Sequence, residues 1–357
     1  MTGSRKIAST SFERVSLPLE VGFTISRGTT DTAENVIVEI EDTRGNVGVG
    51  SAAPAAYYDE TPASAANALP ELLEVVEAIG DPTRLQTIEE ELESESPGEA
   101  AARAAVSIAL HDLVATQAEE PLYRRLGLDP TRTPATSYTV GIDSPPEMAR
   151  KAQRAVGAGH SILKVKLGTE DDRTRIDAIR KAAPQARIRV DANCDWTATE
   201  AIEKTDWLAN AGVEFVEQPV PAGDIDGLAR VREEGFLPVA ADESCVVAED
   251  VPDIADAVDI VVVKLMKCGG IRPAIRQIET ANAHGLDVML GCMVESNASI
   301  AGSCHLSPLV EYADLDGALL LGDDCYEGVP MPDGQINLSE VERGTGVRRA
   351  EDWEKRS

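Results

Sequence analysis

The chain has 357 residues, 43% of them hydrophobic, and 62 acidic residues outnumber 33 basic residues, which gives a net charge of −29 at pH 7. Nucleic acids and anionic membranes bind basic surfaces, so this charge excludes both as partners. The acidic residues gather on expected helix faces, and this pattern predicts a surface adapted to high salt, where counterions screen the repulsion between like charges.

No apolar run approaches the roughly 20 residues that cross a bilayer. The first residues, MTGSRKIASTSFERV, lack the apolar core of a secretion signal, which favours a cytoplasmic location. Six cysteines stand singly with no C-x-x-C pair, so neither a disulfide framework nor a zinc site is expected. The length predicts one large domain and a smaller one.

Residues 1–125 are expected to form an α+β domain. Strand-like segments such as ENVIVEIED and VGVGSAAP flank a turn at residues 44–46 (Arg-Gly-Asn), which favours an antiparallel pairing. Residues 62–118 are rich in alanine and carry apolar residues at helical spacing, so they are expected to be helical.

From about residue 135, short apolar strands alternate with helical stretches. Repeated units of this kind predict an α/β fold with a parallel sheet, and eight of them predict a closed barrel over residues 126–320. Residues 321–357 lack this rhythm and are expected to pack back on the first domain. The eight expected strands are 136–142, 162–168, 187–193, 213–219, 237–244, 259–266, 287–293 and 311–317.

Nearly every expected barrel strand ends in polar or ionisable residues, and such strand ends meet on the face where barrels of this kind carry out chemistry. Asp191, Glu217 and Asp242 end three successive strands. Three converging carboxylates need a cation to offset their repulsion. Oxygen ligands without His or Cys favour Mg²⁺ over Ca²⁺. Each acid taken alone could instead cap the helix that follows it.

The segments KVKLG, DAN, VEQP, ADES and KLMKCGG, in this order, resemble the enolase superfamily in its muconate-lactonizing subgroup. The resemblance covers essentially the whole chain and implies a (β/α)7β TIM-type barrel with an N-terminal α+β capping domain. It implies one Mg²⁺ per subunit on Asp191, Glu217 and Asp242. Asn193 and Glu243, which stand near these acids, are expected to support the metal site without binding the ion. We also expect a homo-oligomer.

Lys164 and Lys166 alternate in one expected strand, so both project from the same face. The resemblance implies acid/base work by Lys166 and by Lys264, which ends the sixth strand. Lys264 stands across the barrel from Lys166, and two bases on opposite faces of one carbon suit a 1,1-proton transfer through an enediolate. Lys164 is interpreted as the neighbour that keeps Lys166 partly deprotonated. A salt bridge from Lys164 to Glu217 or Glu243 is the simpler interpretation and can coexist with this role. Lys164 is also expected to contact the substrate.

In the segment DLDG, Asp314 and Asp316 stand two apart at the end of the eighth strand, so both carboxylates are expected to face the pocket and bind a substrate ammonium group. Dipeptide epimerases carry a D-x-D at this place, and GCMVES also resembles that group, which implies a dipeptide substrate. Cycloisomerases and o-succinylbenzoate synthases share the two lysines and remain the alternatives. A D-x-D would repel their anionic substrates.

The segment FTISRGTTDTAEN, residues 23–35, resembles the mobile capping loop of dipeptide epimerases. Arg27 in this segment is expected to bind a side-chain carboxylate, which makes L-Ala-D/L-Glu the leading substrate. Asp31 and Asp59 could instead select a cationic side chain.

Residues near these motifs receive smaller roles. Cys292 and Met293 are expected to line the pocket, and Ser296 is expected to contact the substrate. Lys267 is expected at the surface or in a loop, because period-2 alternation places it off the face of Lys264. The histidines fall away from the strand ends and receive no catalytic role; they are His111, His160, His284 and His305.

Overall fold

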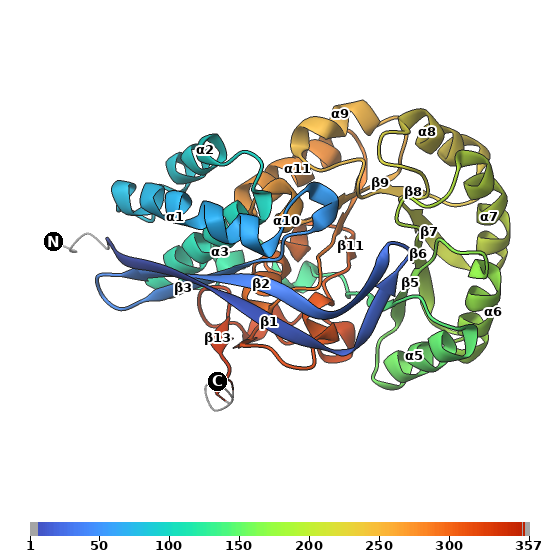
Figure 1. Cartoon of the computed structure of the whole chain (residues 1–357), viewed down its shortest axis with the longest axis horizontal. Helices are drawn as coiled ribbons and strands as arrows, with labels where there is room; N and C mark the ends of the chain where they lie inside the picture. The colour runs from blue at the N-terminus through green and yellow to red at the C-terminus, as the bar shows by residue number, and fades with distance from the viewer. Residues whose placement is uncertain (1–5, 352, 354–357) are drawn as a thin grey trace.

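The computed structural model describes residues 6–351 and 353. Its first part contains a three-stranded antiparallel sheet in the order β1-β2-β3 (Figure 1). The turn between β2 and β3 forms where it was predicted, because the Asp42 carboxylate accepts hydrogen bonds from the backbone N–H groups of Arg44 and Asn46. The strands are β1 (Ile7–Ile25), β2 (Gly28–Asp42) and β3 (Val47–Ala52).

Helix α3 packs directly on β3. Gly48 and Gly50 make this approach possible, because a Cβ atom at either position would lie 2.1 Å from a backbone oxygen of α3. The alternating glycines of VGVG therefore fix how closely the helix meets the sheet. The helices of this part are α1 (Pro62–Ile79), α2 (Leu85–Glu95), α3 (Ala100–Gln117) and α4 (Leu122–Arg125).

The second part is the predicted parallel barrel. Eight strands follow one another in chain order around the sheet, and a parallel bridge between Thr136 and Ala313 joins the first strand region to the last. Each expected strand is present, although shorter than expected. The strands are β4 (Tyr138–Val140), β5 (Ile162–Lys166), β6 (Arg187–Asp191), β7 (Val213–Glu217), β8 (Val239–Ala241), β9 (Ile260–Val263), β10 (Asp287–Leu290) and β11 (Tyr312–Ala313).

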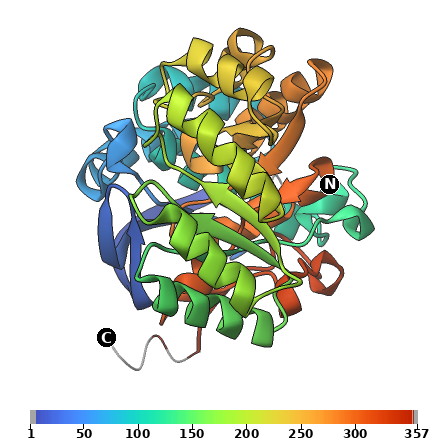
Figure 2. The ribbon, with the colours of Figure 1, turned by 90° about the vertical axis from the view of Figure 1, so that its right-hand side faces the viewer.

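Helices cover the outside of this barrel, as Figure 2 shows for α5 to α8. The longer ones are amphipathic and bury one face against the strands, as their sequence pattern predicts. The helices are α5 (Pro145–Gly157), α6 (Asp172–Ala182), α7 (Ala198–Asn210), α8 (Ile225–Glu234), α9 (Val251–Ile254), α10 (Leu265–Cys268), α11 (Ile271–Ala283) and α12 (Asn297–Cys304).

The last segment returns to the first part of the chain. The backbone N–H of Leu122 donates to Gly344 over 2.8 Å, and the N–H of Thr345 donates to the Asp112 carboxylate of α3 over 2.7 Å. A short antiparallel pair, β12 (Tyr326–Glu327) and β13 (Arg348–Arg349), lies in this segment. Residues 1–5, 352 and 354–357 of the predicted first and last segments lie outside the described residues.

Two exclusions can be compared with the fold. Over the part of the chain that the structure describes, no helix combines the length and the apolarity that a membrane crossing needs. All six cysteines are free, in agreement with the prediction from their spacing.

Candidate active site

A cavity of about 730 Å³ is lined by residues at the ends of the barrel strands and by residues of β1 and β2. Figure 1 shows the hairpin of β1 and β2 reaching across to the barrel. Residues from both parts of the chain line it, so the first part completes the site. Asp191 and Glu217 are fully buried and contact the lysines of the lining. The predicted site residues in the lining are Arg27, Lys164, Lys166, Asn193, Asp242, Glu243, Lys264, Met293, Asp314 and Asp316, and Cys292 lines it too.

The two lysines of β5 share a face and a partner. Lys166 Nζ lies 2.6 Å from Asp191 Oδ2, and Lys164 Nζ lies 3.2 Å from the same oxygen. Lys164 also contacts Glu217 and Asp314, each at 2.8 Å. Burial alone would lower the pKa of Lys164, but the charges of Asp314, Glu217 and Asp191 raise it well above the ordinary lysine value. The acids therefore favour the ammonium form of Lys164, and the predicted contact with Glu217 is present.

Asp242 is held by two lysines, one of which was placed wrongly from the sequence. Lys264 Nζ lies 2.7 Å from Asp242 Oδ2, and Lys267 Nζ lies 2.7 Å from Asp242 Oδ1. Lys267 is only 2% exposed, so its predicted surface or loop position is wrong. The chain turns from strand to helix at Leu265, where α10 begins, and helical spacing then brings Lys267 back toward Asp242.

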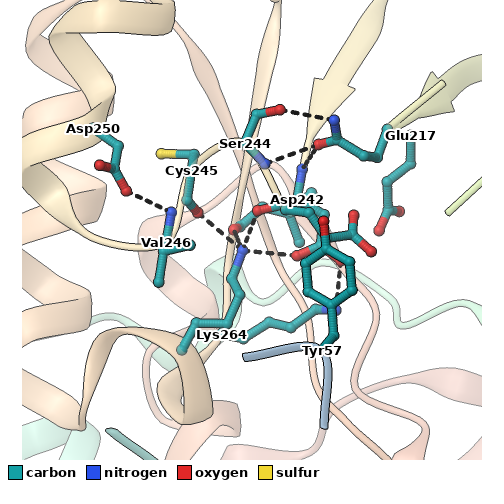
Figure 3. A network of polar contacts seen from close by, with 12 residues as sticks. Tyr57, Glu217, Asp242, Ser244, Cys245, Val246, Asp250 and Lys264 are labelled. Carbon is teal, nitrogen blue, oxygen red and sulfur yellow. Dashed lines mark hydrogen bonds and ion pairs between the residues drawn. The ribbon is translucent and has the colours of Figure 1, made fainter. Parts of the chain in front are cut away.

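Three acids end adjacent strands, which is the arrangement that a metal site would need. Asp191 pairs with Glu217 across β6 and β7, and Asp242 directly follows β8. Figure 3 shows Asp242 between Glu217 and the segment of Ser244 and Cys245. Burial and the charge of Asp191 raise the pKa of Glu217, so the acids repel one another in a poorly solvated interior.

The donor chemistry of these acids fits Mg²⁺, because all three offer buried carboxylate oxygens. Asn193 Oδ1 and Glu243 Oε2 are buried nearby without a hydrogen-bond partner, so further acceptors face the same region. Within residues 6–351 and 353, no three His, Cys, Asp or Glu side chains are already placed so that together they could hold a metal ion. Lysine ammonium groups lie between the acids instead.

Gln218 was missed by the sequence reasoning, although it immediately follows Glu217. Its side-chain oxygen accepts from the backbone N–H groups of Asp242 at 3.0 Å and of Ser244 at 3.1 Å. Its amide nitrogen donates to Ser244 Oγ at 2.8 Å. Gln218 thereby fixes the backbone of Asp242 and Ser244. The only signal was its place between the strand-ending Glu217 and Pro219.

Asp314 and Asp316 both line the cavity, but their surroundings differ. Asp314 contacts Lys164 at 2.8 Å and accepts from the Ser137 hydroxyl, so its charge is already balanced. Among the described residues, the Asp316 carboxylate accepts hydrogen bonds from Thr139 alone, through its backbone N–H and its hydroxyl. Burial and the charge of Asp314 raise the pKa of Asp316 to about 7. Asp316 is therefore the acid that a cationic ligand group would complete.

The segment predicted as a loop is the tip of the β1–β2 hairpin. Arg27 lies there, with Nη2 2.9 Å from Glu243 Oε1 and its guanidinium 4.5 Å from the centre of the Tyr57 ring. Tyr57 lines the cavity and was not singled out from the sequence. Asp31 and Asp59 are exposed and are absent from the lining in the described part of the chain, so the structure does not support their selecting a side chain.

Ser296 has a structural role that the sequence reasoning did not assign. It is the N-cap of α12, where its hydroxyl accepts from Ala298 N at 3.1 Å and donates to Asp324 at 2.7 Å. The side chain is fully buried and is not part of the described lining, so the predicted contact with substrate is not supported. A serine before a helix is a common cap, because its oxygen satisfies a free N–H group.

The histidines lie where they were expected. His111 is on α3, His284 closes α11, and His305 follows α12. His160 precedes β5 and lies against the Tyr138 ring in a tilted arrangement, with ring centres 4.9 Å apart, outside the large cavity. None of the four lines the cavity in the described residues.

Comparison with known proteins places this geometry in a family. Residues 8–127 match the model described as Mandelate racemase / muconate lactonizing enzyme, N-terminal domain. Residues 147–353 match the model described as Enolase C-terminal domain-like. An L-Ala-D/L-Glu epimerase of Bacteroides thetaiotaomicron is 39% identical over 93% of this chain and 86% of its own.

Two solved structures extend the comparison. A dipeptide epimerase of Enterococcus faecalis complexed with Mg and L-Leu-L-Tyr is 34% identical, with a TM-score of 0.90 over 96% of this chain and all of the other. A dipeptide epimerase of Methylococcus capsulatus complexed with Mg and L-Arg-D-Lys is 35% identical, with a TM-score of 0.89 over 96% of this chain and 99% of the other. The chain thus belongs to the mandelate racemase/muconate lactonizing enzyme family of the enolase superfamily, among the relatives of the dipeptide epimerases.

Proposed function

We propose that this protein is a Mg²⁺-dependent dipeptide epimerase that inverts the α-carbon of the C-terminal residue of its substrate. The observation that carries the proposal is that one cavity is lined by two lysines from opposite sides of the barrel and by Asp316, an acid that has no ion-pair partner among the described residues. Lys166 lies at the end of β5 and Lys264 directly after β9, four strands further round the ring of eight. Asp316 lines the same cavity.

Lys166 and Lys264 are the two bases. Each is tied to a different acid, Lys166 to Asp191 and Lys264 to Asp242, so their Nζ atoms are held apart. A substrate α-carbon between them meets one amine on each face. One lysine removes the α-proton, and the other delivers a proton to the opposite face, which inverts the configuration.

Asp191, Glu217 and Asp242 would hold the metal ion. When bound, Mg²⁺ supplies positive charge beside the substrate carboxylate and so stabilises the negative charge that develops as the α-proton leaves. Asn193 and Glu243 support these acids from neighbouring positions, and Lys164 keeps Glu217 in place through contacts with both of its carboxylate oxygens.

Asp316 binds the N-terminal ammonium group of the dipeptide. The site offers this group a carboxylate that Thr139 orients and that no cation neutralises among the described residues. Asp314 contributes through Lys164, since its own charge is paired. The anionic substrates of cycloisomerases and o-succinylbenzoate synthases would be repelled by Asp316, which disfavours those alternatives.

L-Ala-D/L-Glu is the leading substrate because Arg27 can meet a side-chain carboxylate at the mouth of the cavity. A substrate carboxylate would exchange with Glu243 as the partner of Arg27, in a position supported by Tyr57. Met293 lines the cavity and offers an apolar contact to the dipeptide.

The direct test is incubation of L-Ala-L-Glu, L-Ala-L-Leu and L-Ala-L-Lys with the protein and Mg²⁺, followed by chromatographic separation of the diastereomers. We expect L-Ala-D-Glu to appear fastest and to stop appearing when EDTA removes the metal. Conversion of the leucine or lysine dipeptide alone would overturn the role of Arg27. Failure to convert any dipeptide, with metal bound, would overturn the epimerase itself.

The setting of the enzyme is proposed from its composition. We place it in the cytoplasm of a cell with high internal salt, because the chain combines free cysteines with a net charge of −29. The expected homo-oligomer stays a prediction, and light scattering coupled to size-exclusion chromatography would measure it.

A further inference from the structure

The two oxygens of the Asp242 carboxylate face different groups. Oδ2 contacts Lys264, whose side chain lines the cavity. Oδ1 contacts Lys267, which is not part of the described lining. One oxygen therefore faces the site, and the other is engaged from behind by a second ammonium group.

Lys267 makes further contacts that anchor it at this oxygen. Its Nζ atom also donates to the backbone carbonyls of Asp242 at 2.6 Å, Val262 at 2.8 Å and Cys245 at 3.0 Å. These acceptors surround the ammonium group and lie on β9 and on the loop after β8. The side chain is only 2% exposed, so these contacts lie away from bulk solvent.

Asp191 repeats the arrangement with a different donor. Its Oδ2 contacts Lys166 at 2.6 Å, toward the cavity. Its Oδ1 accepts from the backbone N–H of Asn193 at 2.8 Å. Asn193 has a φ of +47°, a left-handed conformation that asparagine tolerates better than most residues and that turns this N–H back onto the carboxylate.

We propose that Lys267 and the backbone of Asn193 restrict each aspartate to a single metal-binding oxygen and thereby select Mg²⁺ against Ca²⁺. Mg²⁺ requires six ligands near octahedral angles, which a chelating carboxylate cannot supply, whereas Ca²⁺ accepts two oxygens from one carboxylate and a higher coordination number. This inference rests on the proposed metal site. It gives Lys267 the part of a positioning residue.

A simpler role for Lys267 would be to lower the negative charge of the site. That role acts equally on two ions of the same charge, so removing Lys267 would change the affinities for Mg²⁺ and Ca²⁺ by the same factor. The ratio of the two dissociation constants therefore separates the control of coordination from simple neutralisation.

Titration calorimetry with Mg²⁺ and with Ca²⁺ on the wild type and on Lys267→Met tests the proposal. In the variant, the ratio of the Ca²⁺ to the Mg²⁺ dissociation constant should fall by about tenfold or more, because Oδ1 of Asp242 becomes available to the larger ion. Lys204→Met is the matched control, since Lys204 pairs with Asp172 on the outside of the barrel, and its ratio should stay at the wild-type value. An unchanged ratio in folded Lys267→Met would overturn the proposal.

Lys267→Gln is the second variant, to be used if Lys267→Met does not fold. Its side-chain amide can still donate to the backbone carbonyls. The wild type gives an independent reading through infrared spectra of protein labelled with ¹³C-aspartate. Added Ca²⁺ should produce no chelating aspartate band, and such a band would contradict the proposal. Absence of any Mg²⁺ binding to the wild type would instead overturn the metal site on which the inference rests.

Discussion

Single residues decide what this cavity accepts, and the two acids of DLDG illustrate it. Asp314 and Asp316 are both buried and two residues apart, yet only Asp314 has a lysine partner. Asp316 has only the hydrogen bonds from Thr139 to support its charge, so its pKa is raised to about 7. In the free enzyme, Asp316 therefore takes up a proton as the pH falls below about 7. The protonated acid is neutral and cannot attract an ammonium group.

We expect kcat/KM for a dipeptide to fall as the pH drops below about 7. In Asp316→Asn, the value at neutral pH should be lower by about 30-fold or more, since one partner of a buried charge pair is lost. The acidic limb of the pH profile should also flatten. N-acetyl-L-Ala-L-Glu, which lacks the ammonium group, provides the comparison, because the variant should no longer distinguish it from L-Ala-L-Glu. Wild-type discrimination in the variant would contradict this role for Asp316.

At the scale of elements, the segment after α12 ties the two parts of the chain together through His305. The Nδ1 atom of His305 accepts from the backbone N–H of Tyr123 at 2.9 Å, and Nε2 lies 3.1 Å from the Thr345 carbonyl. Burial lowers the pKa of His305 to about 4, below the ordinary value near 6.5. The unfolded chain thus takes up this proton between about pH 6.5 and 4, and the folded chain does not.

The folded state should therefore lose stability through His305 as the pH falls from 6.5 to 4, by up to about 3 kcal/mol. Asp112 and Glu60 act in the opposite sense, since burial raises their pKa values to about 6 and about 7. The test is therefore a difference: urea unfolding of the wild type and of His305→Gln at several pH values. The variant should be less stable at pH 7, and the gap should shrink toward pH 4. A constant gap would show that His305 does not carry this dependence.

The elements also show how far the sequence could predict this site. The strands and their terminal acids follow from local pattern, because a buried strand is a short apolar run and its end is marked by the first polar residues. The position of Lys267 was predicted wrongly because the strand ends and helix α10 begins between Lys264 and Lys267. The strand repeat of two residues and the helix repeat of about 3.6 residues place Lys267 on different faces. Ser296 lies where a cap and a substrate contact look alike in sequence.

The contacts of the hairpin could not be predicted for a different reason. Arg27 contacts Glu243 and Tyr57, which come from distant parts of the chain. The local sequence around Arg27 does not specify these contacts. The unequal pairing of Asp314 and Asp316 likewise depends on Lys164 and Thr139, which come from two other strands.

For the whole molecule, the net charge of −29 is the dominant property. Some of the few basic residues, such as Lys164 and Lys267, are buried in ion pairs at the site. The surface therefore carries a strong excess of acidic residues. Repulsion between surface charges acts over about 10 Å in 0.1 M salt and over about 3 Å in 1 M salt. The folded state should therefore gain stability as salt is added.

We expect the thermal unfolding midpoint to rise by about 5 °C or more between 0.1 and 2 M KCl, as measured by circular dichroism. The same comparison at a pH where protonation of the acids cancels the net charge serves as the control, and there the effect should nearly vanish. A midpoint that is unchanged or lower in 2 M KCl at pH 7 would argue against adaptation to salt.

The central claim is that Lys166 and Lys264 serve opposite faces of one α-carbon. The test is NMR of L-Ala-L-Glu and L-Ala-D-Glu in D2O with Mg²⁺. It measures how fast the wild type, Lys166→Ala and Lys264→Ala each exchange the α-proton of the glutamate residue of the substrate. Both variants should fail to interconvert the diastereomers, and each retained lysine should exchange the α-proton of one diastereomer only, with the opposite preference in the two variants. Full epimerisation by either variant would contradict the two-lysine mechanism.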